Sequence, residues 1–313
     1  MQSQAPGSIL MIRPSNFGYN PLTARSNTFQ KSDTAVLPKE INLLARKEFD
    51  NFTDYLIRSN IRTLVFEDYM DVLLPDAVFP NNWVSFHHDG TVVLYPMMAE
   101  NRRLERRKDI LLRLQDEYNF DIKRIIDYTN YEIDGRFLEG TGSVVFDYTN
   151  KMAYSNVSPR TDKIVFNKMC SDLGFEGILF TARTPSGKDI YHTNVMMCIG
   201  SDFVVICLEA VPDESTRTAL SESFEKTRHE IVKISFRQLK SFAGNMIEVL
   251  TQNDVPSLIM SESAFRSLDK GQLKTLSRHA DLLFAPIPGI EKYGGGSARC
   301  MIAGIFLPEI NKS

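Results

Sequence analysis

Three side chains could together carry out nucleophilic and acid–base chemistry. Cys300 follows the glycine-rich segment 293–299, which can bend close to a ligand, and the preceding Arg299 favours the nucleophilic thiolate. His192 opens an apolar run, where an imidazole can face a cavity. Glu139 lies between an apolar pair and two glycines and is suited to orienting a histidine or binding a polar nitrogen. A buried cysteine, a core histidine and a solvated turn glutamate are the competing interpretations.

Amide side chains stand near two of these positions. Asn81 and Asn82 precede the only tryptophan, and Asn194 lies two residues after His192. Buried amides need hydrogen-bond partners, which either a ligand or a capping turn can supply. The glycine-rich segment before Cys300 lacks the Gly-Lys-Ser/Thr ending of a phosphate-binding loop, so the sequence does not favour nucleotide binding.

A repeat predicts how these distant residues come together. Five segments begin with a small or amide-bearing residue and continue as an apolar run, and most then turn into a second apolar run. They start at Asn81, Glu139, His192, Gly244 and Ala298. The spacing of roughly 50 to 60 residues suits arrayed units of a hairpin, a helix and a further strand. A cyclic array would make Asn82, Glu139, His192, Gly244 and Cys300 converge on one centre.

The segments between the hairpins predict the remaining elements. Apolar residues at spacings of three and four indicate helices over 102–118, 163–173, 215–226 and 261–277. Short strands are expected before the hairpins, at 63–68, 123–128, 232–235 and 281–287. The prediction is an α/β fold with one domain over 1–313, built as a five-bladed pseudo-symmetric propeller of ββαβ-type repeats.

The ordered motifs resemble a known family. FPNNW, FLEGTG, SPRT, YHTN, FAGN and a glycine-rich cysteine near the carboxyl end are similar to the guanidino-group modifying superfamily of arginine deiminases, dimethylarginine hydrolases and amidinotransferases. The likeness covers most of the chain and is nearest to the citrulline utilization hydrolase branch. It implies the five-bladed pentein fold, with Cys300 as nucleophile, His192 as general acid/base and Glu139 as the carboxylate near it. Arg160 would clamp the substrate α-carboxylate.

The motifs depart from the arginine-processing pattern at two positions. Asn82 and Asn194 stand where such relatives carry aspartates that grip a cationic guanidinium. Amides can both donate to and accept from a neutral ureido group, so citrulline is the favoured substrate. The expected reaction is hydrolysis to ornithine, ammonia and carbon dioxide through a covalent Cys300 intermediate, with no metal or organic cofactor. An arginine-type deiminase or dihydrolase, an amidinotransferase and a non-catalytic amino-acid-binding propeller remain alternatives.

Composition bounds the partners. With a formal charge of -3 and 43% hydrophobic residues, the chain is expected to be globular and to bind neither nucleic acid nor membranes. The basic run 102–108 has acidic neighbours at helical spacing and predicts a solvated helix face. Four scattered cysteines and the absence of a long apolar segment indicate reduced thiols and a cytoplasmic location. The expected partner is a small guanidino or ureido amino acid, and a homodimer is compatible with the sequence.

Overall fold

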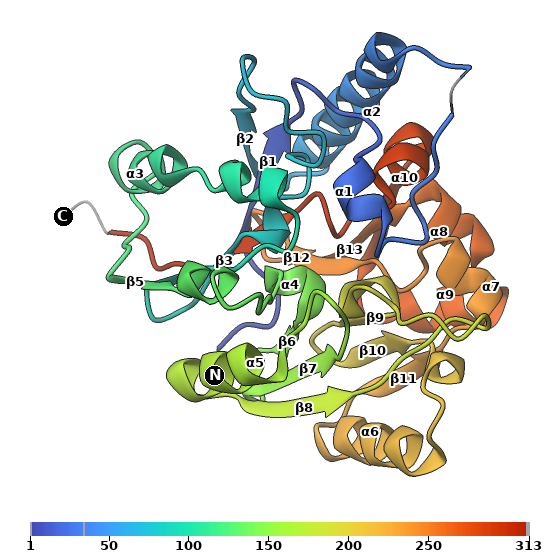
Figure 1. Ribbon diagram of the computed structural model, residues 1–313. Coiled ribbons are helices and arrows are strands. Elements are labelled where there is room, and N and C mark those ends of the chain that lie inside the picture. Colours follow the sequence, from blue (N-terminus) through green and yellow to red (C-terminus); the bar gives the residue numbers. More distant parts are fainter. Residues whose placement is uncertain (1, 34, 311–313) are drawn as a thin grey trace.

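Five three-stranded sheets surround a common centre in the computed structural model, which describes residues 2–33 and 35–310 (Figure 1). The first two sheets contain β3 (Val84–Phe86), β4 (Thr91–Leu94) and β5 (Arg124–Asp127), then β6 (Val145–Asp147), β7 (Met152–Asn156) and β8 (Glu176–Phe180). The next two contain β9 (Met197–Ile199), β10 (Phe203–Ile206) and β11 (Glu230–Lys233), then β12 (Ile247–Leu250), β13 (Pro256–Ser261) and β14 (Asp281–Ala285). The fifth contains β15 (Ala303–Ile305), β1 (Ser8–Arg13) and β2 (Arg62–Glu67). This arrangement is the predicted five-bladed α/β propeller.

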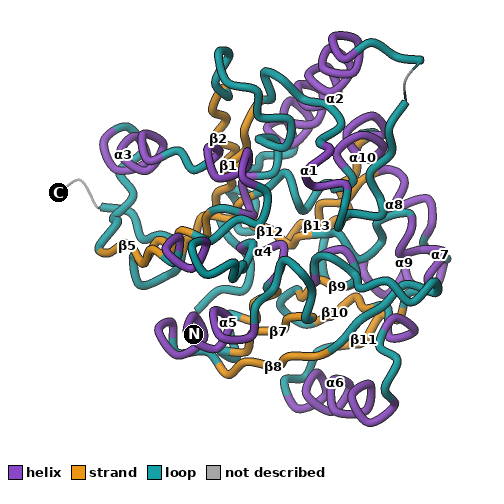
Figure 2. Tube along the Cα trace, in the orientation of Figure 1, coloured by secondary structure: helices purple, strands orange, loops and turns teal. Residues whose placement is uncertain are grey.

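Each blade repeats one pairing pattern. The first strand is antiparallel to the second, as where Ser85 lies opposite Val93, and the second is parallel to the third, as where Val93 lies opposite Ile126. A parallel pair needs a crossover connection, which places helices between the second and third strands. The crossover helices are α2 (Pro38–Arg58), α3 (Lys108–Asp116), α5 (Lys163–Leu173), α6 (Glu214–Lys226), α8 (Glu262–Ser267) and α9 (Lys270–Leu276). They lie outside the strands (Figure 2).

Shorter helices connect the remaining elements. They are α1 (Pro21–Ala24), α4 (Gly140–Ser143), α7 (Phe236–Lys240) and α10 (Pro288–Gly294), with the 3₁₀ turns η1 (Pro80–Asn82), η2 (Glu100–Glu105), η3 (Thr129–Glu132), η4 (Thr193–Val195) and η5 (Leu208–Ala210). Among the described residues, no helix has both the length and the apolar character needed to cross a membrane.

Both ends of the described chain build the fifth blade. β15 is antiparallel to β1, with Ala303 opposite Leu10, and β1 is parallel to β2. The fifth apolar run therefore finds its second and third strands at the other end of the chain, and the ring closes through backbone hydrogen bonds. Because Cys300 lies just before β15, this closure brings it to the centre beside the residues of the other blades.

The predicted helices agree with the structure where local signals are strong. Helix α5 matches 163–173, because Asp162 accepts hydrogen bonds from the amides of Ile164 and Val165 and Gly174 ends the helix with a positive φ of 70°. The predictions of single helices over 102–118 and 261–277 are wrong. The first divides into η2 and α3, and the second into α8 and α9.

Two strands and one helix of the structure were not predicted from the sequence. The strands expected before the hairpins are the third strands of the preceding blades, whereas β8, β1 and the long helix α2 were not predicted.

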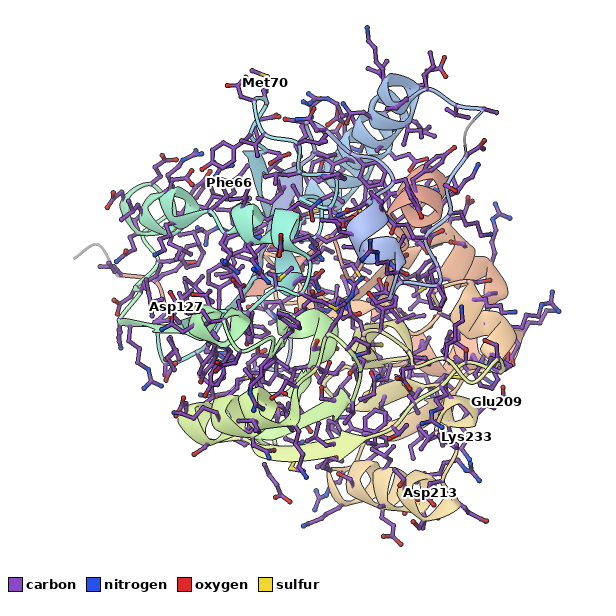
Figure 3. The ribbon with its side chains drawn as sticks, in the orientation of Figure 1. Phe66, Met70, Asp127, Glu209, Asp213 and Lys233 are labelled. Carbon is purple, nitrogen blue, oxygen red and sulfur yellow. The ribbon has the colours of Figure 1, made fainter. Side chains whose placement is uncertain are left out.

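Apolar side chains fill the spaces between blades in four clusters. Glu209, Asp213 and Lys233 lie toward one edge of the molecule, away from the centre (Figure 3).

Candidate active site

The hairpin starts meet at the centre through close backbone packing. Helix α4 contacts both η1 and η4. A Cβ atom on Gly140, whose φ is +47°, would lie 2.3 Å from the Asn81 carbonyl oxygen. A Cβ atom on Gly142 would lie 2.4 Å from Asn82 Nδ2 and 2.7 Å from His192 Nδ1. Only glycine allows these approaches, so the glycines of FLEGTG bring the first three blades together.

His192 and Glu139 form a buried pair. The ring Nε2 lies 2.8 Å from Glu139 Oε2, and the other carboxylate oxygen accepts a hydrogen bond from the Met98 amide at 3.1 Å. Arg160 Nη1 donates to the same Glu139 Oε2 at 3.2 Å. Glu139 thus holds the ring through Nε2, and Nδ1 lies on the side of Gly142 and Asn82.

Burial and charge set the protonation states of this pair. Burial lowers the pKa of His192 to about 4, against the opposing effect of the Glu139 hydrogen bond. Burial by itself would raise the pKa of Glu139, but Arg160, the His192 hydrogen bond and Arg102 together hold that pKa well below its usual range. At neutral pH the site therefore contains a neutral imidazole beside a carboxylate, which is an arrangement that can accept a proton and stabilise the resulting imidazolium.

Two amides surround the Cys300 sulfur. Asn245 Nδ2 lies 3.3 Å from Sγ and Asn194 Nδ2 lies 3.5 Å from it, so both are placed to donate. The backbone amide of Cys300 donates to the Ser297 carbonyl at 3.0 Å and is not free for a ligand. Side-chain amides therefore surround the sulfur more directly than the backbone of the glycine-rich segment does. That segment instead lets the chain turn after α10, where Gly295 has a φ of 63°.

His192 and Cys300 line one small cavity. Its other lining residues come from the first three blades, from the segment that leads into the fifth blade and from the N-terminal segment before α2. They are Thr23, Asn27, Asp76, Phe79, Asn82, Arg102, Arg160, Tyr191, Gly294 and Gly296. This "substrate cavity" contains a thiol, an imidazole and charged groups of both signs, which are the groups that acyl or amidino transfer uses.

A buried ionic network forms one wall of the substrate cavity. Arg102 Nη2 and Nε contact Glu105 at 2.8–3.1 Å, Nη1 donates to Asn82 Oδ1 at 2.8 Å, and Nε lies 3.8 Å from Asp76 Oδ2. The prediction that the basic run is a solvated helix face is therefore wrong for Arg102 and Glu105. Both are buried, because the run begins in η2, which packs its polar side chains toward the centre.

Asp76 contributes a carboxylate with a free oxygen. Its Oδ2 accepts from Asn20 Nδ2 at 2.7 Å and from the Thr23 hydroxyl at 3.0 Å. Its Oδ1 is buried without a hydrogen-bond partner among the described residues. Asn82 Nδ2 is likewise buried and unpaired. Buried polar atoms of this kind normally have partners, so both atoms are available to a bound molecule.

The segment before α2 closes the substrate cavity. Arg160 Nη2 donates to the Thr23 carbonyl at 2.8 Å, and its Nε donates to the Ser26 hydroxyl at 2.9 Å. Asn27 Nδ2 donates to the carbonyls of Gly294 and Gly295 at 3.3 and 3.2 Å. These contacts place the segment over the cavity in which His192 and Cys300 are buried.

The predicted site residues take three kinds of position. Asn82, Glu139, Arg160, His192 and Cys300 surround the substrate cavity, with Glu139 just behind its lining. Asn194 contacts the Cys300 sulfur but lines a second cavity on the other side. Asn81 lines neither cavity, and both polar atoms of its side chain are buried without partners among the described residues.

Sequence reasoning missed three residues of the site: Asp76, Arg102 and Asn245. Asn245 stands at the fourth hairpin start directly after Gly244, and its equivalence to Asn82 and Asn194 in the repeat was the available signal. The positions of Asp76 and Arg102 follow from tertiary packing.

Comparison with known proteins decides the family. The sequence profile described as N,N-dimethylarginine dimethylhydrolase, eukaryotic, matches residues 13–307. The chain belongs to this family. It is therefore placed among the guanidino-modifying proteins of the pentein superfamily. A search of curated proteins found no match.

Solved structures share the fold at low sequence identity. ArgZ, an arginine dihydrolase from the ornithine–ammonia cycle in cyanobacteria, superposes with a TM-score of 0.73 at 15% identity over 97% of this chain. The chain spans about two fifths of that protein, since the match covers 41% of it. The ArgZ N-terminal domain, as a cysteine-to-serine variant bound to substrate, gives 0.71 at 14% identity, covering 94% of this chain and 96% of the domain.

A dimethylarginine dimethylaminohydrolase also matches. A histidine-to-glycine variant of it, described as an adduct with S-methyl-L-thiocitrulline, gives a TM-score of 0.63 at 14% identity. The match covers 95% of this chain and 99% of that one. At such identities these likenesses establish the shared fold.

Proposed function

We propose that this protein is a cysteine-dependent hydrolase of a ureido or guanidino amino acid, with citrulline as its substrate. The observation that carries the proposal is the substrate cavity itself, where Cys300 and His192 meet beside one carboxylate with a free oxygen. Family membership supports the same chemistry, as does the fold shared with ArgZ, an arginine dihydrolase, and with a dimethylarginine dimethylaminohydrolase.

Charge favours citrulline over arginine. Asp76 Oδ1 can accept from one cationic group, and the α-amino group of any amino acid substrate supplies that cation. An arginine guanidinium would bring a second cation, yet Glu139 is already bound by His192, Arg160 and the Met98 amide. On the Nδ1 side of the His192 ring lies the side-chain amide of Asn82, which carries no charge. A neutral ureido group can accept from that amide without needing a counter-charge.

The α-carboxylate is assigned to Arg160. Its three nitrogens each make one hydrogen bond to protein groups, which leaves further N–H groups on Nη1 and Nη2. Arg160 also lies over the Tyr191 ring, with its guanidinium carbon 4.9 Å from the ring centroid, and this contact fixes the plane of the fork. A carboxylate on Arg160 and an ammonium on Asp76 would orient the side chain of the substrate toward Cys300.

The reaction follows from the protonation states. The neutral His192 ring takes the Cys300 thiol proton, and the thiolate attacks the ureido carbon. The bond from that carbon to the substrate chain nitrogen breaks, and the imidazolium protonates the departing amine, which gives ornithine and S-carbamoyl-Cys300. His192 then accepts a proton from water, and the resulting hydroxide attacks the carbamoyl carbon. The C–S bond breaks, the imidazolium returns its proton to the Cys300 sulfur, and carbamic acid leaves and decomposes to ammonia and carbon dioxide.

The test is a product assay on the purified protein. We expect ornithine and ammonia from citrulline, and less turnover of arginine, dimethylarginine and acylated arginines. Cys300→Ala should abolish turnover, whereas the matched variant Cys170→Ala, at a buried cysteine in another blade cluster, should retain it. Release of ammonia and citrulline from arginine would overturn the choice of substrate. Undiminished activity of a folded Cys300→Ala protein would overturn the mechanism.

A further inference from the structure

A second cavity lies on the axis of the propeller. It has a volume of about 50 Å³, and the first strand of every blade contributes to its wall. Representative lining residues are Ser85, Phe146, Cys198, Glu248 and Ala303. The substrate cavity is lined by different residues, and Cys300 with Asn194 forms the partition between them. We call the second space the "axial cavity".

Arg299 brings a cation into the axial cavity. Its Nη1 donates to the Ile302 carbonyl at 2.7 Å, which leaves the edge formed by Nε and Nη2 without a hydrogen bond to the described residues. Within residues 2–33 and 35–310, no carboxylate forms an ion pair with this guanidinium. Burial lowers the pKa of Arg299, as expected of a charge removed from water without a counter-ion.

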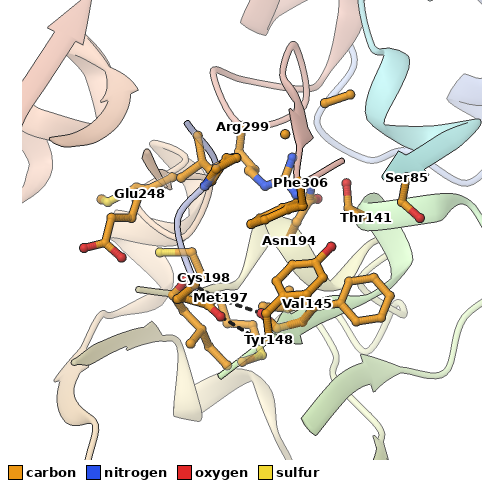
Figure 4. A pocket seen from close by; sticks show the side chains of 18 of the residues that line it. Ser85, Thr141, Val145, Tyr148, Asn194, Met197, Cys198, Glu248, Arg299 and Phe306 are labelled. Carbon is orange, nitrogen blue, oxygen red and sulfur yellow. Dashed lines mark hydrogen bonds between the residues drawn. The ribbon is translucent and has the colours of Figure 1, made fainter. Parts of the chain in front are cut away.

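The carboxylate that lines the same cavity is committed elsewhere. Glu248 Oε2 accepts from the Ser201 amide at 2.6 Å and from the Ser201 hydroxyl at 2.7 Å. In Figure 4 its carboxylate points away from Arg299. Removing a charge from water without a counter-charge is destabilising. Arg299 is partly buried and has no ion-pair partner among the described residues, so an anion from outside the chain has a place beside it.

Other groups around the Arg299 guanidinium indicate which kind of anion fits beside it. Tyr148 is buried on the cavity wall, and among the described residues its hydroxyl makes no hydrogen bond. Part of the wall is apolar, since Val145, Met197 and Phe306 line the same cavity (Figure 4). Two parallel N–H groups on one edge of a guanidinium match a planar group with two oxygens, and a phenol can donate to one of them.

We propose that the axial cavity binds a small planar oxyanion, of the carboxylate or bicarbonate type, on the free edge of Arg299 and the Tyr148 hydroxyl. The site lies directly behind the nucleophile, because Arg299 precedes Cys300 and Asn194 separates the two cavities. A bound anion would offset the positive charge that Arg299 places beside the Cys300 sulfur. Occupancy would therefore slow the reactions of Cys300 without any contact with the substrate.

Binding can be tested with formate on the full chain. At constant ionic strength, replacing chloride by sodium formate should raise the thermal midpoint in a saturable way and slow alkylation of Cys300 by iodoacetamide at least twofold. Arg299→Met should abolish both effects. Tyr148→Phe, which keeps the ring and removes only the hydroxyl, should weaken formate binding several-fold.

Two controls separate this site from others. Arg160→Gln should keep the formate-dependent shift, since the substrate cavity is the other place where a carboxylate meets a buried arginine. Arg183→Met changes an exposed arginine and should leave both effects intact. A formate effect that survives Arg299→Met, or that disappears in Arg160→Gln and not in Arg299→Met, overturns the proposal. So does equal stabilisation by formate and chloride. None of these readouts depends on which substrate the enzyme hydrolyses.

Discussion

Replacing Glu139 by glutamine should slow catalysis strongly while leaving the site assembled. The carboxylate lies 2.8 Å from His192 Nε2, and glutamine keeps the shape and a hydrogen-bond acceptor but removes the charge. The charge of Glu139 stabilises only the imidazolium form of His192. The variant should therefore slow the proton-transfer steps. A charge-assisted hydrogen bond in a buried site is worth about 2–4 kcal/mol. This corresponds to a decrease in kcat of roughly 30- to 900-fold.

The assay compares kcat and its pH profile with those of a matched variant. Glu105→Gln removes another buried carboxylate of the same network, on Arg102, without touching His192. Burial raises the pKa of Glu105 to about 8, so its uncharged form is already tolerated and kcat should change by less than about threefold. Glu139 raises the pKa of His192, so Glu139→Gln should also move the acidic limb of the profile to lower pH.

One result would refute this reasoning. If folded Glu139→Gln protein kept kcat within threefold of the wild type and showed an unshifted acidic limb, Glu139 would not stabilise the imidazolium. Glu139 would then serve only to hold Arg160 in position. Folding is checked by near-ultraviolet circular dichroism, because loss of the charge also leaves Arg160 without its ion-pair partner.

Three further predictions follow from local geometry. Gly142→Ala places a Cβ atom against Asn82 and His192 and should lower kcat/KM at least tenfold in steady-state assays, whereas Gly7→Ala, with no atom within 4 Å, should be neutral. Asn245→Ala removes a donor to the Cys300 sulfur and should slow alkylation of that thiol by roughly 5- to 10-fold, as a neutral hydrogen bond of about 1 kcal/mol implies. His87 has a pKa lowered by burial to about 3, so between pH 6.5 and 3 the unfolded state binds a proton that the folded state does not. The free energy of unfolding should therefore decrease as the pH is lowered from 6.5 to 3, by up to about 4 kcal/mol from this group. Urea titrations should show a flatter pH dependence for His87→Gln.

The sequence by itself determined the repeat, the blade order and most of the residues that lie together around the substrate cavity. Period-2 apolar runs with turn signals at a regular spacing specify local hairpins, and α5 was predicted to its ends because its capping signals are local. Cys300, His192, Glu139 and Arg160 stand in motifs whose order along the chain is itself informative. These features depend on neighbours within a few residues, which is why they can be predicted without a structure.

Only the tertiary structure decided what closes the ring and what surrounds the nucleophile. The fifth blade pairs Ala303 with Leu10 across nearly the whole chain, and nothing local to either strand specifies that partner. Arg102 reads as an exposed basic residue, yet burial beside Glu105 and Asp76 makes it a wall of the substrate cavity. Burial, ion pairing and cavity shape are properties of residues from different blades in contact. These properties arise only when the blades assemble and bring residues of different repeats into contact around one cavity.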